Sequence, residues 1–278
     1  MQDRVVTQVI TPALVSEGAG VRLRRSFPGR SLDHLDPFLL LDDFSSDRPK
    51  DYLAGFPMHP HRGIETVTYL LDGEVHHQDS IGHAGVVGPG DCQWMTAGRG
   101  ILHEEMPRPV DGRIAGFQLW VNLPARLKMT APRYQEVPAY RIPQLLLDDG
   151  VQVRLVAGRV GQVEGPVREI AAEPTYLDVT IPAGVRFQHP VEQSHNALIY
   201  LYAGVAHVSE QQLEAPRLAV LGEGDRVIIH ATDAAAHLLL VAGRPWGEPV
   251  ARYGPFVMNT REEIQHTLLE LRQGTFIR

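Results

Sequence analysis

Two short motifs contain residue types that bind transition metals. They are His59-Pro60-His61 and His103-Glu104-Glu105. Side chains alternate between the faces of a β-strand, so residues two positions apart point the same way. Each motif therefore places two ligands on one face, and two such strands facing each other bring together three imidazoles and one carboxylate. This set suits iron, manganese, nickel, copper or zinc better than magnesium or calcium, which prefer oxygen ligands.

Two alternatives to this ligand set remain open from the residues alone. A single His-x-His motif is more often made of surface or core histidines, and the metal interpretation depends on the two pairs occurring together. Glu65 lies four residues after His61 and has the same strand parity, so it competes with Glu105 for the role of carboxylate ligand. Parity does not decide between these two glutamates.

The elements that must position these residues are predicted to be β-strands. The 26 glycines and 21 prolines separate short apolar runs such as 66–71, 117–121, 198–202 and 237–241. Short strands at regular spacing with Gly/Pro turns are typical of a sandwich or barrel. One helix is predicted near the C-terminus, where Thr260 and Glu263 form a capping box and Gly274 is suited to the C-cap. We expect its Ile264, Leu268 and Leu271 to form the apolar face, and the helix to pack outside the barrels.

An internal repeat predicts two related domains. Residues 65–73 align with 196–204, so that Tyr69 matches Tyr200 and Gly73 matches Gly204 at an offset of 131. A second alignment places the Gly-x-Gly-Asp sequence at 88–91 on the one at 222–225, at an offset of 134. We therefore expect an all-β chain of two stacked antiparallel jelly-roll barrels, residues 1–135 and 136–278, joined within the Pro-rich stretch 132–143.

The repeat also indicates which domain binds metal. At these offsets the four candidate ligands align, in order, with Pro190, Glu192, His237 and Leu239. Only one imidazole is kept, so the C-terminal domain is expected to lack metal ligands. His189 and His195 lie nearby, but they are six residues apart and do not form a His-x-His pair.

Composition limits the class of protein. The net charge of −7 argues against a broad nucleic-acid or anionic-membrane surface, and no run of 18 apolar residues predicts a membrane span. Cys92 is the single cysteine, so no intramolecular disulfide can form. The N-terminus does not resemble a signal peptide. We expect a cytoplasmic monomer, with a nuclear location also open if the source is eukaryotic.

Longer motifs resemble the pirin family of bicupins. They are DPFLLLDDF at 36–44, HPHRGIETV at 59–67, GDCQWMTAGRGILH at 90–103 and GPFVMNT at 254–260. The resemblance covers almost the whole chain. Pro89-Gly90 departs from the general cupin Pro-x-Gly but keeps the pirin form.

The resemblance implies two stacked cupin barrels, with Fe(II) held in the N-terminal one by His59, His61, His103 and Glu105. It favours Glu105 over Glu65. Pirins are similar to quercetin 2,3-dioxygenases, which implies cleavage of a flavonol with dioxygen. Other pirins are regulators, which implies instead an iron-dependent protein that binds a transcription factor or a metabolic enzyme complex.

The expected chemistry follows from the ligand number. Four protein ligands leave two positions of an octahedral ion for dioxygen or for the hydroxyl and carbonyl of a flavonol. Glu105 is the expected catalytic base, taking the proton of the hydroxyl. Phe56, Met58, Trp94 and Met95 are candidates for an apolar pocket, although such residues more often belong to the core.

Overall fold

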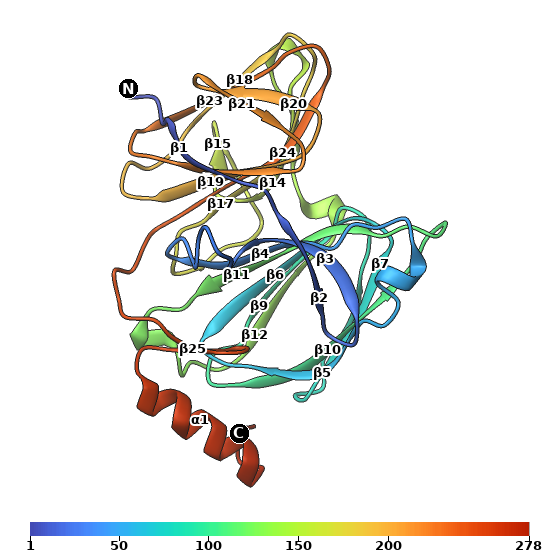
Figure 1. The fold of residues 1–278 in the computed structure, drawn as a ribbon, viewed down its shortest axis with the longest axis vertical. Helices are drawn as coiled ribbons and strands as arrows, with labels where there is room; N and C mark the ends of the chain where they lie inside the picture. Colours follow the sequence, from blue (N-terminus) through green and yellow to red (C-terminus); the bar gives the residue numbers. More distant parts are fainter. Residues whose placement is uncertain (278) are drawn as a thin grey trace. The chain divides into compact units, whose positions relative to one another are not determined.

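The computed structural model describes residues 1–277, and strands make up most of the chain (Figure 1). It contains two compact domains, and each is assembled from two stretches of sequence. The N-terminal domain comprises Ala13–Ala139 and the segment from Trp246 onward, whereas the C-terminal domain comprises Met1–Pro12 and Tyr140–Pro245. The sequence predicted two continuous halves that meet near residue 135. The structure differs because each end of the chain belongs to the other half's domain.

The N-terminal domain is built from a seven-stranded and a four-stranded antiparallel sheet. The larger sheet has the order β12 (Arg133–Val137), β9 (Cys92–Thr96), β6 (Ile64–Asp72), β11 (Ala115–Asn122), β4 (Phe38–Asp43), β3 (Val21–Phe27) and β2 (Ala13–Glu17). The smaller has the order β5 (Phe56–His61), β10 (Ile101–Arg108), β7 (Glu74–Asp79) and β8 (Ala84–Val87). The Thr68 hydroxyl of the larger sheet donates to the Glu105 carboxylate of the smaller one, so the two sheets face each other across a common interior.

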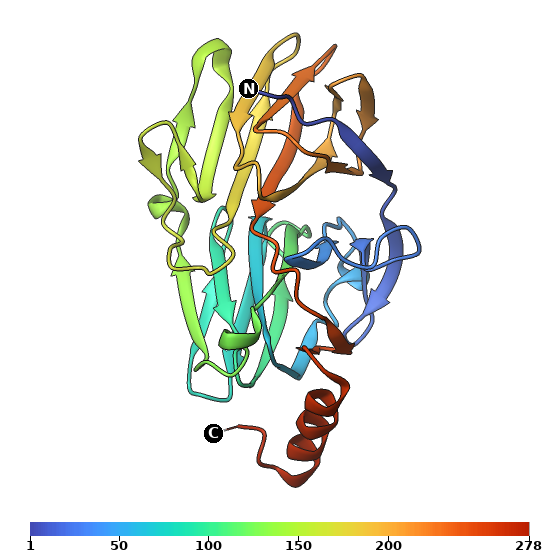
Figure 2. The same ribbon diagram turned by 90° about the vertical axis from the view of Figure 1, so that its left-hand side faces the viewer.

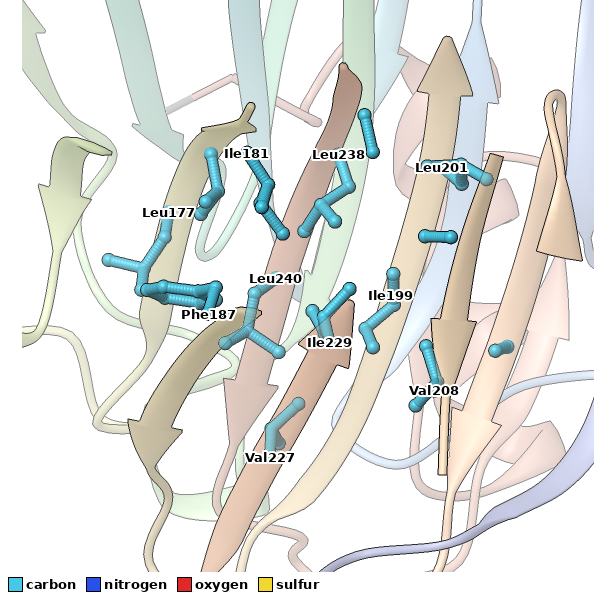
Figure 3. Close-up of a cluster of buried hydrophobic side chains, with 14 of the residues drawn as sticks. Leu177, Ile181, Phe187, Ile199, Leu201, Val208, Val227, Ile229, Leu238 and Leu240 are labelled. Carbon is cyan, nitrogen blue, oxygen red and sulfur yellow. The ribbon is translucent and has the colours of Figure 1, made fainter. Parts of the chain in front are cut away.

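The C-terminal domain repeats this plan. Its larger sheet has the order β1 (Val6–Ile10), β22 (Arg217–Leu221), β19 (Asn196–Ala203), β24 (Ala236–Gly243), β17 (Thr175–Ile181), β14 (Gln152–Ala157) and β13 (Gln144–Leu146). Its smaller sheet has the order β18 (Arg186–Pro190), β23 (Arg226–Ala231), β20 (Val205–Val208) and β21 (Gln211–Glu214). Leu177, Phe187, Ile199, Ile229 and Leu240 lie in one apolar core between these strands (Figure 3). The prediction of two antiparallel jelly-roll barrels is confirmed.

The strand orders explain why the termini change domain. In the N-terminal domain the edge beside β9 is occupied by β12, which follows the barrel in sequence. In the C-terminal domain the equivalent edge, beside β22, is occupied by β1 from the start of the chain. A sequence repeat detects the shared strands but not an edge strand supplied from elsewhere.

Smaller elements complete the chain. They are the hairpins β15 (Arg159–Val160)–β16 (Val163–Glu164) and β25 (Ala251–Tyr253)–β26 (Phe256–Met258), four 3-10 turns at Pro49–Asp51, Ala125–Leu127, Ala139–Arg141 and Asp148–Gly150, and the helix α1 (Arg261–Gln273). The helix lies outside the strands of the N-terminal domain (Figures 1 and 2). No helix within residues 1–277 is long and apolar enough to cross a membrane.

The ends of α1 agree with the prediction, and its buried face agrees in part. Thr260 and Glu263 form the capping box, and Gly274 has the left-handed conformation of a C-cap. Of the three predicted apolar contacts, Ile264 is buried, Leu268 is half-buried against the same apolar cluster and Leu271 is exposed, while the other buried residues of the helix are Thr267 and Glu270. A charged residue on the inward face requires a partner.

Candidate metal centre

Strands β5 and β10 bring three histidines together inside the N-terminal barrel. His103 lies opposite His59 in the antiparallel ladder, and Ile101 lies opposite His61. The ring centroids of His59 and His103 are 4.5 Å apart, and those of His61 and His103 are 5.0 Å apart. The ligand atoms of the three imidazoles all lie within 4.8 Å of one another. Residues 1–277 contain no other group of three or more potential metal ligands.

The hydrogen bonds of His59 indicate which of its nitrogens is available. Its Nδ1 lies 3.0 Å from the carbonyl oxygen of Pro57, to which it can only donate. Its Nε2 therefore carries the free lone pair, and it points at Nε2 of His61 at 3.1 Å. Two nitrogens bound at right angles to one ion, each at about 2.1 Å, lie about 3.0 Å apart. Metal-bound histidine also typically donates its other ring N–H to a backbone carbonyl, as His59 does to Pro57.

Burial favours the neutral form of the His61 and His103 imidazoles. His103 is 1% exposed and His61 2% exposed. Burial lowers the pKa of His61 well below 6.5, and His103 and His59 lower it further. Burial also lowers the pKa of His103 to about 4, against the opposite effect of Glu105. Neither ring nitrogen of His103 has a hydrogen-bond partner in the described chain. Neutral imidazole is the form that binds metal, and such orphaned buried nitrogens fit an ion.

Glu105 faces the same interior, on β10 two residues after His103. The ladder with β5 shifts register here, because Phe56 and not Pro57 lies opposite Glu105, whereas β10 pairs regularly with β7 through both residues. Its carboxylate accepts hydrogen bonds from Thr68 Oγ1 at 3.0 Å and from Gln118 Nε2 at 3.0 and 3.2 Å. Burial raises the pKa of Glu105, but His103, His59 and these hydrogen bonds outweigh burial and lower it below 4.5. The side chain is therefore a charged carboxylate at neutral pH.

Glu65 has a different environment. Strand β5 ends at His61 and β6 begins at Ile64, with Gly63 at φ +79° in the turn between them, so strand parity does not continue from His61 to Glu65. The Glu65 carboxylate accepts a hydrogen bond from Thr96 Oγ1 at 2.7 Å, and burial raises its pKa. The side chains that lower the pKa of Glu65 against this effect are Thr96, Trp94 and Arg133, and none of the three clustered histidines is among them.

A cleft of about 670 Å³ opens onto His59 and His61. Its walls include Phe56, Trp120 and Arg252. The His61 and Trp120 rings are perpendicular with centroids 5.1 Å apart, and the Arg252 guanidinium lies 5.0 Å from the centroid of the same tryptophan. The cleft thus combines an aromatic wall with a cation beside the histidine cluster.

Of the four residues predicted to form an apolar pocket, only Phe56 lines the cleft. Met58 is 45% exposed but is not among the cleft residues, and Trp94 and Met95 are buried in the core. Sequence reasoning missed Trp120 and Arg252 as cleft residues. Trp120 lies on β11 and Arg252 on β25, and no spacing relates either of them to the His-x-His motif.

The C-terminal barrel has other residues at the positions of the four candidate ligands. With the turns at Gly73 and Gly204 aligned, the positions of His59, His61, His103 and Glu105 are taken by His189, Val191, Val227 and Ile229. The last three belong to the apolar core of that domain. One imidazole is kept, as expected from the repeat, but it is His189 and not His237.

The second alignment of the repeat is wrong. The Gly-x-Gly-Asp sequence at 88–91 joins β8 to β9, whereas the one at 222–225 joins β22 to β23. These turns are not equivalent in the strand order, since β22 corresponds to β9 itself. The offset of 134 therefore placed His103 and Glu105 on β24, a strand of the other sheet.

Comparisons with known proteins agree with this architecture. The Pirin family model matches residues 20–121, and the model of the Pirin C-terminal cupin domain matches 176–277. A pirin-like protein from Caulobacter vibrioides is 47% identical, covering 99% of this chain and 100% of that protein. Pirin from Rattus norvegicus is 46% identical, covering 98% of this chain and 93% of that protein. The structure of quercetin 2,3-dioxygenase from Acinetobacter baumannii matches with a TM-score of 0.90 and 34% identity, covering 99% of this chain and 98% of that one. Since both domain models match and the relatives align over nearly the full length, this two-domain cupin belongs to the pirin family.

Proposed function

We propose that the N-terminal domain binds one Fe(II) ion through His59, His61, His103 and Glu105. The observation that carries this proposal is the 3.1 Å approach of the His59 and His61 Nε2 atoms beside the buried, unpartnered imidazole of His103. Three neutral imidazoles and one carboxylate leave a divalent ion with a local charge near plus one. That charge suits an oxidisable ligand with an ionised hydroxyl.

We further propose that the protein is a dioxygenase of flavonols such as quercetin. When bound, the ion supplies Lewis acidity and redox chemistry for a reaction with dioxygen. Phe56 and Trp120 supply aromatic surface for a planar substrate in the cleft, and Arg252 supplies a cation that attracts its enolate. Quercetin 2,3-dioxygenase, a structural relative at 34% identity, supports this substrate class.

Glu105 is the proposed base for the substrate hydroxyl. Its lowered pKa keeps it ionised at neutral pH, and the amide of Gln118, which donates to both carboxylate oxygens, holds it in place. Asp42, Phe56 and Gln118 line both the open cleft and the smaller cavity that Glu105 lines. The proposed base therefore lies in a cavity adjacent to the space proposed for the substrate.

The proposal is tested by reconstituting the protein with Fe(II) without oxygen and then adding quercetin and air. We expect slow loss of quercetin that requires both iron and dioxygen. The second candidate function is an iron-dependent regulator that binds a protein partner, because this role needs the same ion but no turnover. Iron-loaded protein that consumes no dioxygen with any flavonol, while a partner binds only one oxidation state, would establish the regulator instead.

Glu105→Gln and Glu65→Gln form a matched pair for identifying the carboxylate ligand. Both glutamates are buried, and each accepts a hydrogen bond from a threonine hydroxyl. We expect Glu105→Gln to weaken Fe(II) binding by about 100-fold, since it removes a negative charge from the ligand set. Glu65→Gln should change binding by less than about 3-fold, because its carboxylate accepts from Thr96 and is not part of the histidine group. Competitive metal titration measures both, and the reverse ranking would make Glu65 the ligand.

A further inference from the structure

The residue that follows His61 is an arginine buried inside the N-terminal domain. The side chain of Arg62 is 3% exposed. Burying a guanidinium is costly unless its hydrogen bonds are satisfied, so its partners indicate what it does. We infer that Arg62 is a positioning residue of the metal centre, held in place by the C-terminal segment that carries α1. This inference rests on the proposed metal site.

The guanidinium is satisfied mainly by residues that follow the barrel in sequence. Nη1 donates to Glu270 Oε2 at 2.5 Å and to Thr267 Oγ1 at 3.0 Å, both on α1. Nη2 lies 3.5 Å from the carbonyl oxygen of Phe276, whose ring centroid is 4.5 Å from the guanidinium carbon. Nε donates to the carbonyl oxygen of Arg99 at 2.5 Å. All the nitrogens of this side chain are therefore engaged.

These bonds link the two strands that carry the histidines. Arg62 directly follows the last residue of β5, whereas Arg99 lies in the turn that leads into β10. Beyond that turn, Ile101 pairs with His61, and then His103 pairs with His59. The Arg62 side chain thus fixes the end of one ligand strand against the start of the other, beside the Ile101–His61 pair.

The main chain of the same turn is also held. Arg62 N donates to Pro255 O at 3.4 Å, and Val257 N donates to Arg62 O at 3.0 Å. The buried ammonium of Lys128 donates to the carbonyl oxygens of Gly63 and Val257, each at 2.9 Å. The backbone after His61 is therefore hydrogen-bonded to the C-terminal segment, both directly and through Lys128.

A purely structural role in anchoring α1 does not account for a buried ion pair. Phe256, Met258, Ile264 and Phe276 already form an apolar cluster between the helix and the hairpin beneath it. Replacing a buried ion pair by apolar residues is often neutral or stabilising. An apolar contact cannot supply directional hydrogen bonds such as the one from Arg62 Nε to the Arg99 carbonyl oxygen. That bond lies next to the Ile101–His61 pair, and so next to the proposed metal ligands. Partners outside the ligand shell typically change metal affinity by about 10- to 100-fold.

The test compares Glu270→Gln and the double variant Arg62→Met, Glu270→Leu with the wild type. Cobalt(II) is the probe, its affinity is measured by competition, and its visible absorption bands report the geometry of the ligands. We expect both variants to bind cobalt about 10- to 100-fold more weakly with altered bands, and the double variant to keep a wild-type melting temperature. Glu262→Gln, the same change at an exposed position of α1, is the matched control and should alter neither readout.

The outcomes separate this inference from the proposed metal site. If the wild type binds no cobalt, the proposed site itself is wrong. If the wild type binds but the folded double variant has the same affinity and bands, Arg62 only anchors the helix and the inference is wrong. Should the double variant fail to fold, Glu270→Gln decides by the same two readouts.

Discussion

Replacing His59 and His61 together by alanine is expected to reduce the metal content from one ion per chain to below ~0.1. The Nε2 atoms of the two imidazoles lie 3.1 Å apart, and residues 1–277 contain no second group of three potential metal ligands. Loss of even an outer-shell partner costs about 10- to 100-fold in affinity, so loss of two direct ligands should exceed about 10⁴-fold. Elemental analysis after Fe(II) loading and desalting measures the result.

The control for this variant lies in the other domain. His189→Ala removes the histidine that occupies the position of His59 in the C-terminal barrel, where the remaining positions are Val191, Val227 and Ile229. We expect it to leave the stoichiometry at one. A wild-type protein with two tightly bound ions, or a His189 variant that loses one, would contradict the assignment of a single site to the N-terminal domain.

Replacing His103 by alanine is expected to lower iron- and oxygen-dependent turnover of quercetin by about 1,000-fold, equivalent to roughly 4 kcal/mol in the activation free energy. His103 is the proposed ligand from the second strand, and alanine offers no nitrogen to bind the ion in its place. The measurement is the rate of quercetin loss at saturating Fe(II). His237→Ala, at the position that the sequence repeat aligned with His103, should keep the wild-type rate. Turnover that survives in the His103 variant would remove the reaction from this centre.

The sequence predicted the parts of the site that depend on local alternation. His103 and Glu105 are buried while Glu104 between them is less so, as a two-residue period requires. The same logic failed at Glu65 because the turn at Gly63 lies between His61 and Glu65, and a period does not survive a turn. It also did not include the shift of register opposite His103 and Glu105, which falls on β5 between Phe56 and His59, where Pro57 is the residue type that marks a bulge.

Long-range pairing was the main feature that the sequence did not reveal. The capping box of α1 was readable because its residues are three positions apart, whereas the inward orientation of Glu270 depends on Arg62, 208 residues away. The edge strand β1 was likewise unpredictable, since its pairing partner β22 lies on the far side of the whole N-terminal domain in sequence. In both cases the structure joins segments whose relation has no periodic signal.

Anomalous diffraction at the iron absorption edge, from crystals of the Fe(II)-loaded protein, tests the proposed iron site most directly. We expect one strong anomalous peak per chain, within bonding distance of the Nε2 atoms of His59 and His61, a ring nitrogen of His103 and the carboxylate of Glu105. A peak of equal height beside His189 in the C-terminal barrel, a peak beside Glu65, or no peak among the three histidines would contradict it.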